Sequence, residues 1–192
     1  MVFFGGLKMQ KTRRSNNSHE VILDAAQKVA VEKGAGKVSL DSVAKEAGLT
    51  KGGVLYNFPS KEALIGGMLE RLMTTYTPRV AEQEARLLDQ PNPTLQSVFH
   101  VIRKLEEVDH NIPMAILAAA AHNLDLLKPL REETNRRLQK IRNQATTPDE
   151  ATLLWAAGEG LMLMDMLGLL PFDAKKKTQL LEVLELKAQE KL

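Results

Sequence analysis

The chain has 192 residues, of which 44% are hydrophobic and 26% charged, so it can bury a sizeable core and has the composition of an ordinary globular protein. It has no cysteine, and this excludes disulfides and every thiolate-based metal site or nucleophile. The absence of cysteine is compatible with the reducing cytoplasm, where we expect the protein to act. The net charge of +2 is uneven, since residues 1–64 carry +4 and the remainder −2. An excess of positive charge at the N-terminal end suggests a polyanionic partner there.

The first 17 residues are predicted to be a flexible basic arm with Lys and Arg at positions 8, 11, 13 and 14. Such an arm is either solvated or reaches into a DNA minor groove. Residues 1–6 are apolar but lack the charged start of a signal peptide, and we leave them out of the fold prediction. Asn17 and Glu20 then resemble a helix cap before an apolar stripe that stops at Gly34.

Two short helices follow. Ser39 is a predicted N-cap for a helix that stops at Gly48, and Thr50 caps another that reaches Phe58. A short helix, a tight turn containing glycine and a second short helix have the spacing of a helix-turn-helix. The spacing alone also occurs in proteins that never meet DNA.

The rest of the chain is predicted to be helical throughout. A helix from Ser60 stops before Pro78, and helical patterns continue at 79–89, 94–107, 113–123, 129–143, 148–168 and 173–190. Prolines stand at or just before many of the helix starts. No stretch shows the alternation of a strand, and the longest apolar run, 161–170, is too short for a membrane span. The prediction is an all-α protein of about nine helices.

The two short helices together have an inward apolar side, and the second helix, from Thr50 to Phe58, has an outward polar side. Val43, Ala44, Val54 and Phe58 are expected to pack inward. The outward set is small, polar and hydrogen-bonding: Thr50, Lys51, Gly52, Gly53, Tyr56 and Asn57. The N–H groups and dipole at the start of this helix favour a phosphate, and the two glycines, each costing about 1 kcal/mol of helix propensity, allow close backbone approach to DNA.

Residues 43–64, with the sequence VAKEAGLTKGGVLYNFPSKEAL, closely resemble the tetracycline-repressor (TetR) family, as does the first helix. The resemblance implies a dimer with a three-helix DNA-binding domain, here 18–64, and a helical ligand-binding and dimerisation domain, here 65–192. It places DNA contacts at Ser39, Thr50, Lys51, Gly52, Tyr56, Asn57 and Lys61, to which the outward face adds Gly53. Leu55 stands where the family often has tyrosine, and Asn57 where histidine is common. Leu55 either touches a thymine methyl or packs inward.

The second domain offers candidates for a small-molecule site. Its methionines either fill the core or line an adaptable pocket, and its histidines are either satisfied core residues or ligand contacts, without the spacing of metal ligands. The predicted ligand-binding residues are Met68, Tyr76, His100, Arg103, Met114 and His122. We expect a mainly hydrophobic effector, neutral or anionic, because an aromatic content of 4% argues against an aromatic cage for a cation.

The last two helices are apolar around most of their circumference. This is typical either of a core helix or of a four-helix dimer interface built from two copies, and we favour the interface. The predicted interface residues are Leu154, Gly158, Leu161, Met162, Leu181 and Leu184.

The prediction is therefore a cytoplasmic, ligand-responsive repressor that binds a palindromic operator as a homodimer, with no cofactor. The alternative is an architectural DNA-binding protein of the same fold without a small-molecule effector. An enzyme is disfavoured, because the sequence shows no nucleophile motif, phosphate-binding loop or metal constellation.

Overall fold

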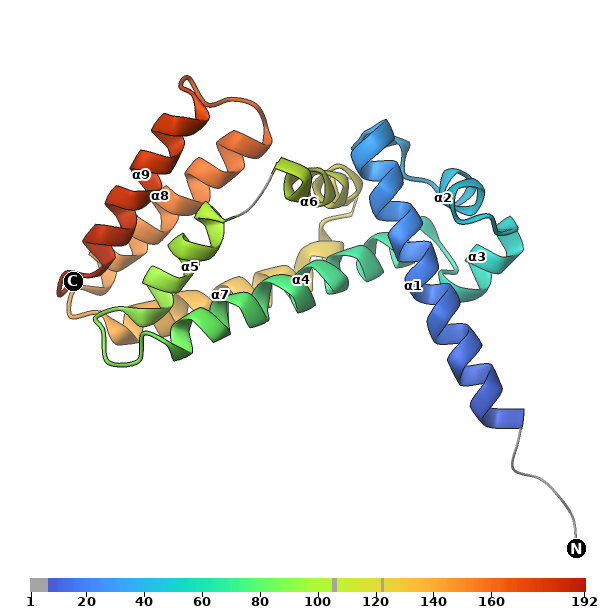
Figure 1. Cartoon of the computed structure of the whole chain (residues 1–192), viewed down its shortest axis with the longest axis horizontal. Coiled ribbons are helices and arrows are strands. Elements are labelled where there is room, and N and C mark those ends of the chain that lie inside the picture. Colours follow the sequence, from blue (N-terminus) through green and yellow to red (C-terminus); the bar gives the residue numbers. More distant parts are fainter. Residues whose placement is uncertain (1–6, 105–106, 122) are drawn as a thin grey trace, which may run out of the picture. The chain divides into compact units, whose positions relative to one another are not determined.

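A computed structural model describes residues 7–104, 107–121 and 123–192, and within these ranges the chain forms nine α-helices, two short 3-10 helices and no strand (Figure 1). The all-α prediction is thereby confirmed. The helices are α1 (Leu7–Lys33), α2 (Leu40–Ala47), α3 (Lys51–Asn57), α4 (Lys61–Ala85), α5 (Pro93–Arg103), α6 (Glu107–Ala120), α7 (Lys128–Gln144), α8 (Pro148–Met166) and α9 (Ala174–Ala188). No helix in the described ranges is both long and apolar enough to cross a membrane.

The chain divides into two compact units. The N-terminal unit comprises Met1–Arg71 and Asn111–Leu126, and the C-terminal unit comprises Leu72–His110 and Leu127–Leu192. The division falls within α4, a continuous helix whose residues up to Arg71 belong to one unit and whose later residues belong to the other.

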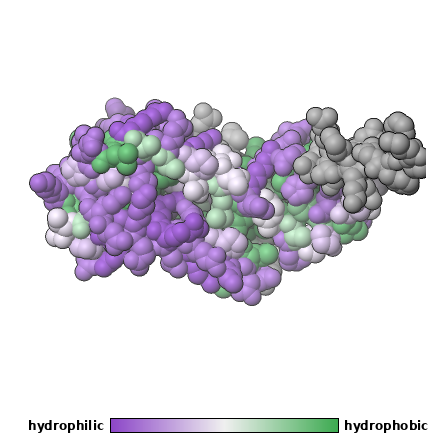
Figure 2. Space-filling model, turned by 90° about the horizontal axis from the view of Figure 1, so that it is seen from below, coloured by the Kyte–Doolittle hydropathy of each residue, from purple (hydrophilic) through white to green (hydrophobic). Residues whose placement is uncertain are grey.

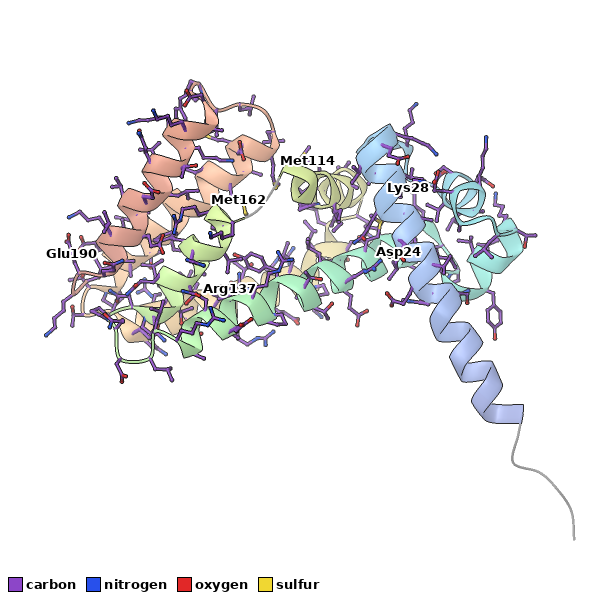
Figure 3. All side chains as sticks on the ribbon, in the orientation of Figure 1. Asp24, Lys28, Met114, Arg137, Met162 and Glu190 are labelled. Atoms are coloured by element: carbon purple, nitrogen blue, oxygen red, sulfur yellow. The ribbon has the colours of Figure 1, made fainter. Side chains whose placement is uncertain are left out.

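In the N-terminal unit, α1 supplies the central apolar face. Ile22, Ala26 and Val29 are fully buried there, and α4 adds Leu64 and Met68. At the edge of this core, the Arg71 guanidinium of α4 lies 2.5 Å from the Asp24 carboxylate of α1, a residue labelled in Figure 3. The ion pair adds a polar link between two helices whose apolar faces already pack together.

Several helix boundaries differ from the predicted ones. The backbone of α1 is helical from Leu7, so residues 7–17 of the predicted flexible arm continue the first helix. Pro78 lies inside α4, and Pro113 lies inside α6, where each was expected to mark a boundary. A proline removes one backbone donor and clashes with one carbonyl, which costs about 3 kcal/mol. Near Pro78, buried contacts such as that of Val80 offset this cost.

The C-terminal unit is built around α5, which α7, α8 and α9 surround. The centre of its core is Phe99, fully buried, against which Gly158 of α8 packs so closely that a Cβ at 158 would lie 2.5 Å from the ring. Asn92, in the left-handed conformation with φ 48°, donates to the carbonyls of Ala188 (3.0 Å) and Glu190 (2.9 Å). These bonds fix the end of α9 against the start of α5.

Candidate nucleic-acid interface

The predicted helix-turn-helix is present as α2 and α3. Ser39 caps α2 by accepting a hydrogen bond from the Ser42 N–H (3.1 Å), and Ser42 completes the capping box by accepting from the Ser39 N–H (3.0 Å). Gly48 ends the helix with φ 64°, a left-handed conformation that glycine adopts without strain. Thr50 caps α3 by accepting from the Gly53 N–H (3.1 Å). The predicted inward residues Val43, Ala44, Val54 and Phe58 are all buried.

A charged cluster clamps α2 to α1. The Glu46 carboxylate of α2 receives the Lys28 ammonium at 2.6 Å and the Lys33 ammonium at 2.7 Å, both from α1, on which Figure 3 labels Lys28. Hydrogen bonds from Lys28, and then from Lys33, lower the pKa of Glu46 to about 2. The clamp fixes the angle of α2, and with it the position of α3, relative to the first helix.

The outer face of α3 is open to solvent. Lys51, Gly52 and Tyr56 are exposed, with 72% of Tyr56 accessible, and Lys61 is exposed at the start of α4. A Cβ at Gly52 would meet nothing nearer than the Thr50 hydroxyl at 4.0 Å. The fold itself therefore does not require glycine at 52.

Some of the predicted DNA contacts already have partners within the protein. Asn57 donates from its amide to the Gly53 carbonyl (3.0 Å) and accepts from the Ser18 hydroxyl (3.3 Å), so both ends of its side chain are engaged. The Lys51 ammonium lies 3.0 Å from the Asp41 carboxylate, but both groups are exposed, and such a pair is worth about 0–1 kcal/mol. Lys51 can therefore reach a phosphate at little cost, whereas Asn57 must first break two bonds.

The predicted ligand-binding residues are divided between the two units. Met68 is fully buried in the N-terminal unit, where Met114 is half-buried, while Tyr76 packs against the core of the C-terminal unit. His100 and Arg103 face the Glu185 carboxylate at 3.5 Å and 3.1 Å. His122 lies outside the described residues, as do the side chains of the basic arm.

The predicted interface residues lie mostly on the inner sides of α8 and α9. Leu181 and Gly158 are buried in the protomer's own core, and the remaining four pack partly against it: Leu154, Leu161, Met162 and Leu184. A different set of apolar residues on the same helices is exposed, namely Leu153, Leu163, Met164, Leu167, Val183 and Leu186. In the sequence, the apolar residues cover most of the circumference of these two helices, and this breadth indicated that they have a second apolar face.

This fold and this exposed helix define a helix-turn-helix DNA-binding regulator. Residues 22–68 match the model of "Bacterial regulatory proteins, tetR family", and residues 93–187 match "Tetracyclin repressor-like, C-terminal domain". The chain therefore belongs to the TetR family of transcriptional regulators, and the resemblance seen in the sequence is confirmed.

Individual proteins are similar to this chain in sequence or in structure. The chain is 25% identical to the nucleoid occlusion factor SlmA of Vibrio atlanticus over 137 residues, which are 71% of this chain and 68% of that protein. It is 39% identical over 62 residues to an uncharacterized HTH-type transcriptional regulator, YvdT, of Bacillus subtilis, covering 32% of each. Among solved structures, the multidrug binding protein EbrR complexed with ethidium matches 87% of this chain and 97% of its own, with 25% identity and a TM-score of 0.63.

Proposed function

We propose that the chain is a homodimeric repressor whose operator binding is controlled by a small molecule. The observation that carries the DNA-binding part is the exposed outer face of α3, where a lysine, a glycine with room for a side chain and a mostly exposed tyrosine follow one another on a capped helix. These groups can contact phosphates and base edges, and the capped start of α3 favours a phosphate.

Dimerisation is proposed to use the second apolar face of α8 and α9. On α8, Leu153 is 71% exposed, and Met164 and Leu167 follow at helical spacing; on α9, Val183 and Leu186 are 52% and 61% exposed. Apolar side chains gathered on two adjacent helices favour a self-complementary contact with a second copy. A two-fold dimer would set two recognition helices about 34–36 Å apart, to match a palindromic operator.

The effector is proposed to bind the C-terminal unit, where α4, α8 and α9 carry partly buried aromatic and apolar side chains. Most of its contact surface would be hydrophobic, with a few polar groups fixing its orientation. A similar protein, EbrR, is described as multidrug binding and was solved with ethidium. A ligand that binds better to the arrangement that does not fit the operator shifts the dimer toward that arrangement, and by linkage it lowers the apparent affinity of the protein for DNA.

The alternative is an architectural DNA-binding protein without a small-molecule effector. The similarity to a nucleoid occlusion factor over 71% of the chain favours it. The two functions differ in what a ligand does. A repressor should be released from its operator by compounds that also raise its melting temperature, whereas an architectural protein should respond to none.

Selection of bound sequences from a random DNA pool tests the core of the proposal. We expect a palindrome whose half-site centres are about one helical turn apart, bound by a dimer. Tyr56→Ala should weaken binding to the selected operator at matched salt. Leu88→Ala, an equally exposed apolar residue on the C-terminal unit at 70% accessibility, is the control and should bind normally. Enrichment of no sequence, or equal binding by both variants, would contradict the placement of the interface on α3.

A further inference from the structure

A groove on the surface of the C-terminal unit is lined mainly by basic and polar side chains. It lies between α4 and α5 and has a volume of about 180 Å³, and its lining residues are Arg79, Glu82, Gln83, Arg86, His100, Val101 and Lys104. Seen from below, the C-terminal unit presents a largely hydrophilic surface at the left of Figure 2. The groove is smaller than the roughly 300–1,000 Å³ of a site for a drug-sized ligand. It therefore suits a small polar molecule.

Helical spacing gathers the residues that α4 contributes to this groove. Glu82, Gln83 and Arg86 follow Arg79 by three, four and seven residues, a spacing that places side chains on one face of a helix. Arg86 is the first residue after α4 ends. This end of α4 therefore supplies two guanidinium groups, a carboxylate and an amide to the same groove.

The positive charges of the groove are only partly neutralised by the protein. Arg79 and Lys104 are exposed, and within the described residues neither side chain makes a hydrogen bond or an ion pair; the same holds for the half-buried amide of Gln83. The Arg86 guanidinium lies 2.5 Å from the Glu82 carboxylate, but the two side chains are 66% and 71% exposed, and such a pair is weak. Three cations thus face one carboxylate, and this excess attracts an anion.

The other acidic groups close to α5 already have basic partners. The Glu185 carboxylate of α9 lies 3.5 Å from His100 Nδ1 and 3.1 Å from the Arg103 guanidinium, which is also 3.6 Å from Glu182. The carbonyl end of α5 is partly negative, and Lys104 follows it directly. These negative groups are therefore offset by α5 itself, and the charge of the groove stays positive.

The spacing of the two arginines selects the length of the anion. Seven helical residues rise about 10 Å, so the side chains of Arg79 and Arg86 start that far apart along α4. A single compact oxyanion fits one of them, whereas two linked oxyanion groups can meet both. Guanidinium groups pair bidentately with phosphate oxygens, and a lysine adds a point charge.

We propose that the groove between α4 and α5 binds a small anion with two phosphoryl groups, of which pyrophosphate is the simplest. Arg79, with Lys104 and Gln83, would hold one phosphoryl group. Arg86 would exchange the exposed Glu82 carboxylate for the other. The site is separate from the hydrophobic effector site proposed above, and its occupation requires neither the operator nor the effector.

Isothermal titration calorimetry of the full-length protein, without DNA and without divalent cations, tests the proposal. Pyrophosphate, phosphate and succinate would be titrated at matched ionic strength, because salt screens exposed charges. We expect saturable binding of one pyrophosphate per chain, and at least about tenfold weaker binding of the other two anions. Phosphate or succinate binding as tightly as pyrophosphate would overturn the proposal, as would the absence of saturable pyrophosphate binding.

Variants locate the bound anion. Arg79→Gln and Arg86→Gln should each weaken pyrophosphate binding about threefold or more, and the double variant at least about tenfold. Arg131→Gln, which changes an exposed arginine of α7 outside the groove, is the control and should bind like the parent. Lys51→Ala, on the DNA-binding surface, should also bind pyrophosphate like the parent. Unchanged binding by a double variant that circular dichroism shows to be folded, or loss of binding in Lys51→Ala, would overturn the proposed site.

Discussion

Two adjacent glycines in α4 allow the packing of the DNA-binding unit to be tested against a matched control. A Cβ at Gly67 would lie 2.7 Å from Cε1 of Phe58 and 3.3 Å from Cδ2 of Leu23, whereas a Cβ at Gly66 would meet nothing within 4 Å. Phe58, at the end of the recognition helix, is only 3% exposed and has little room to move. Alanine at 67 therefore forces the ring, and with it the end of α3, away from α4.

The magnitudes follow from two effects. Each substitution gains about 1 kcal/mol of helix propensity, because both glycines lie inside α4. Gly67→Ala also pays an overpacking cost of about 1–3 kcal/mol, so it should be neutral to destabilising by ~2 kcal/mol while Gly66→Ala stabilises. The propensity gain cancels in the difference between the variants, which isolates the contact with Phe58 and Leu23.

Thermal unfolding of the two full-length variants, followed by circular dichroism, measures this difference. For a chain of this size 1 kcal/mol corresponds to roughly 2–4 °C, so Gly67→Ala should melt at least about 2 °C below Gly66→Ala. Operator binding should weaken in Gly67→Ala alone. Adding Phe58→Leu to Gly67→Ala should cost less than adding it to the parent, since the smaller side chain relieves the clash. Equal melting temperatures would show that Gly67 does not pack on Phe58 as described.

Three further predictions concern charge and assembly. Lys51→Ala should weaken DNA binding across sequences and reduce the slope of log affinity against log salt by about one, and an unchanged slope would mean that Lys51 touches no phosphate. Because the pKa of Glu46 is lowered in the folded state, its ion pairs with Lys28 and Lys33 stabilise the fold above pH 4.5, and this stabilisation is lost as the pH falls toward 2. The melting temperature of Glu46→Gln should therefore depend less on pH over that window. A parallel shift at all pH values would contradict this. Leu153→Asp should leave the helical content intact, because the Leu153 side chain is 71% exposed in the protomer. Sedimentation of this variant should nevertheless show a monomer, because a dimer would bury the unpaired charge. A variant that stays dimeric would place the interface elsewhere.

The helix-turn-helix was predictable because its determinants are local. The side chains of Ser39 and Thr50 accept hydrogen bonds from backbone N–H groups three residues further along the chain. Gly48 adopts a left-handed turn that needs no distant contact. The inward pattern of Val43, Val54 and Phe58 follows from helical periodicity alone. The family resemblance then supplied the function that spacing by itself leaves open.

Local rules failed where long helices pack extensively. Pro78 is a strong local signal for a helix boundary, yet α4 continues through it because contacts on both sides hold the helix. Asn57 stands at a position suited to base contact, but Ser18, 39 residues away in sequence, and the Gly53 carbonyl occupy its side chain. The contact of Ser18 with Asn57 and the packing that carries α4 through Pro78 both depend on residues far from the position concerned.

The amino-acid sequence by itself determined the helices, the caps of the recognition helix and the presence of two apolar faces on α8 and α9. Only the tertiary structure decided which of these faces packs into the protomer's own core. From the sequence, Gly158 and Leu153 are equally plausible inward residues, and Phe99 of α5 packs against Gly158. The same holds for Glu159, whose proximity to Tyr76 and Arg137 depends on three helices meeting. Caps and periodicity act within a few residues, whereas burial and charge pairing depend on neighbours that only the folded chain brings together.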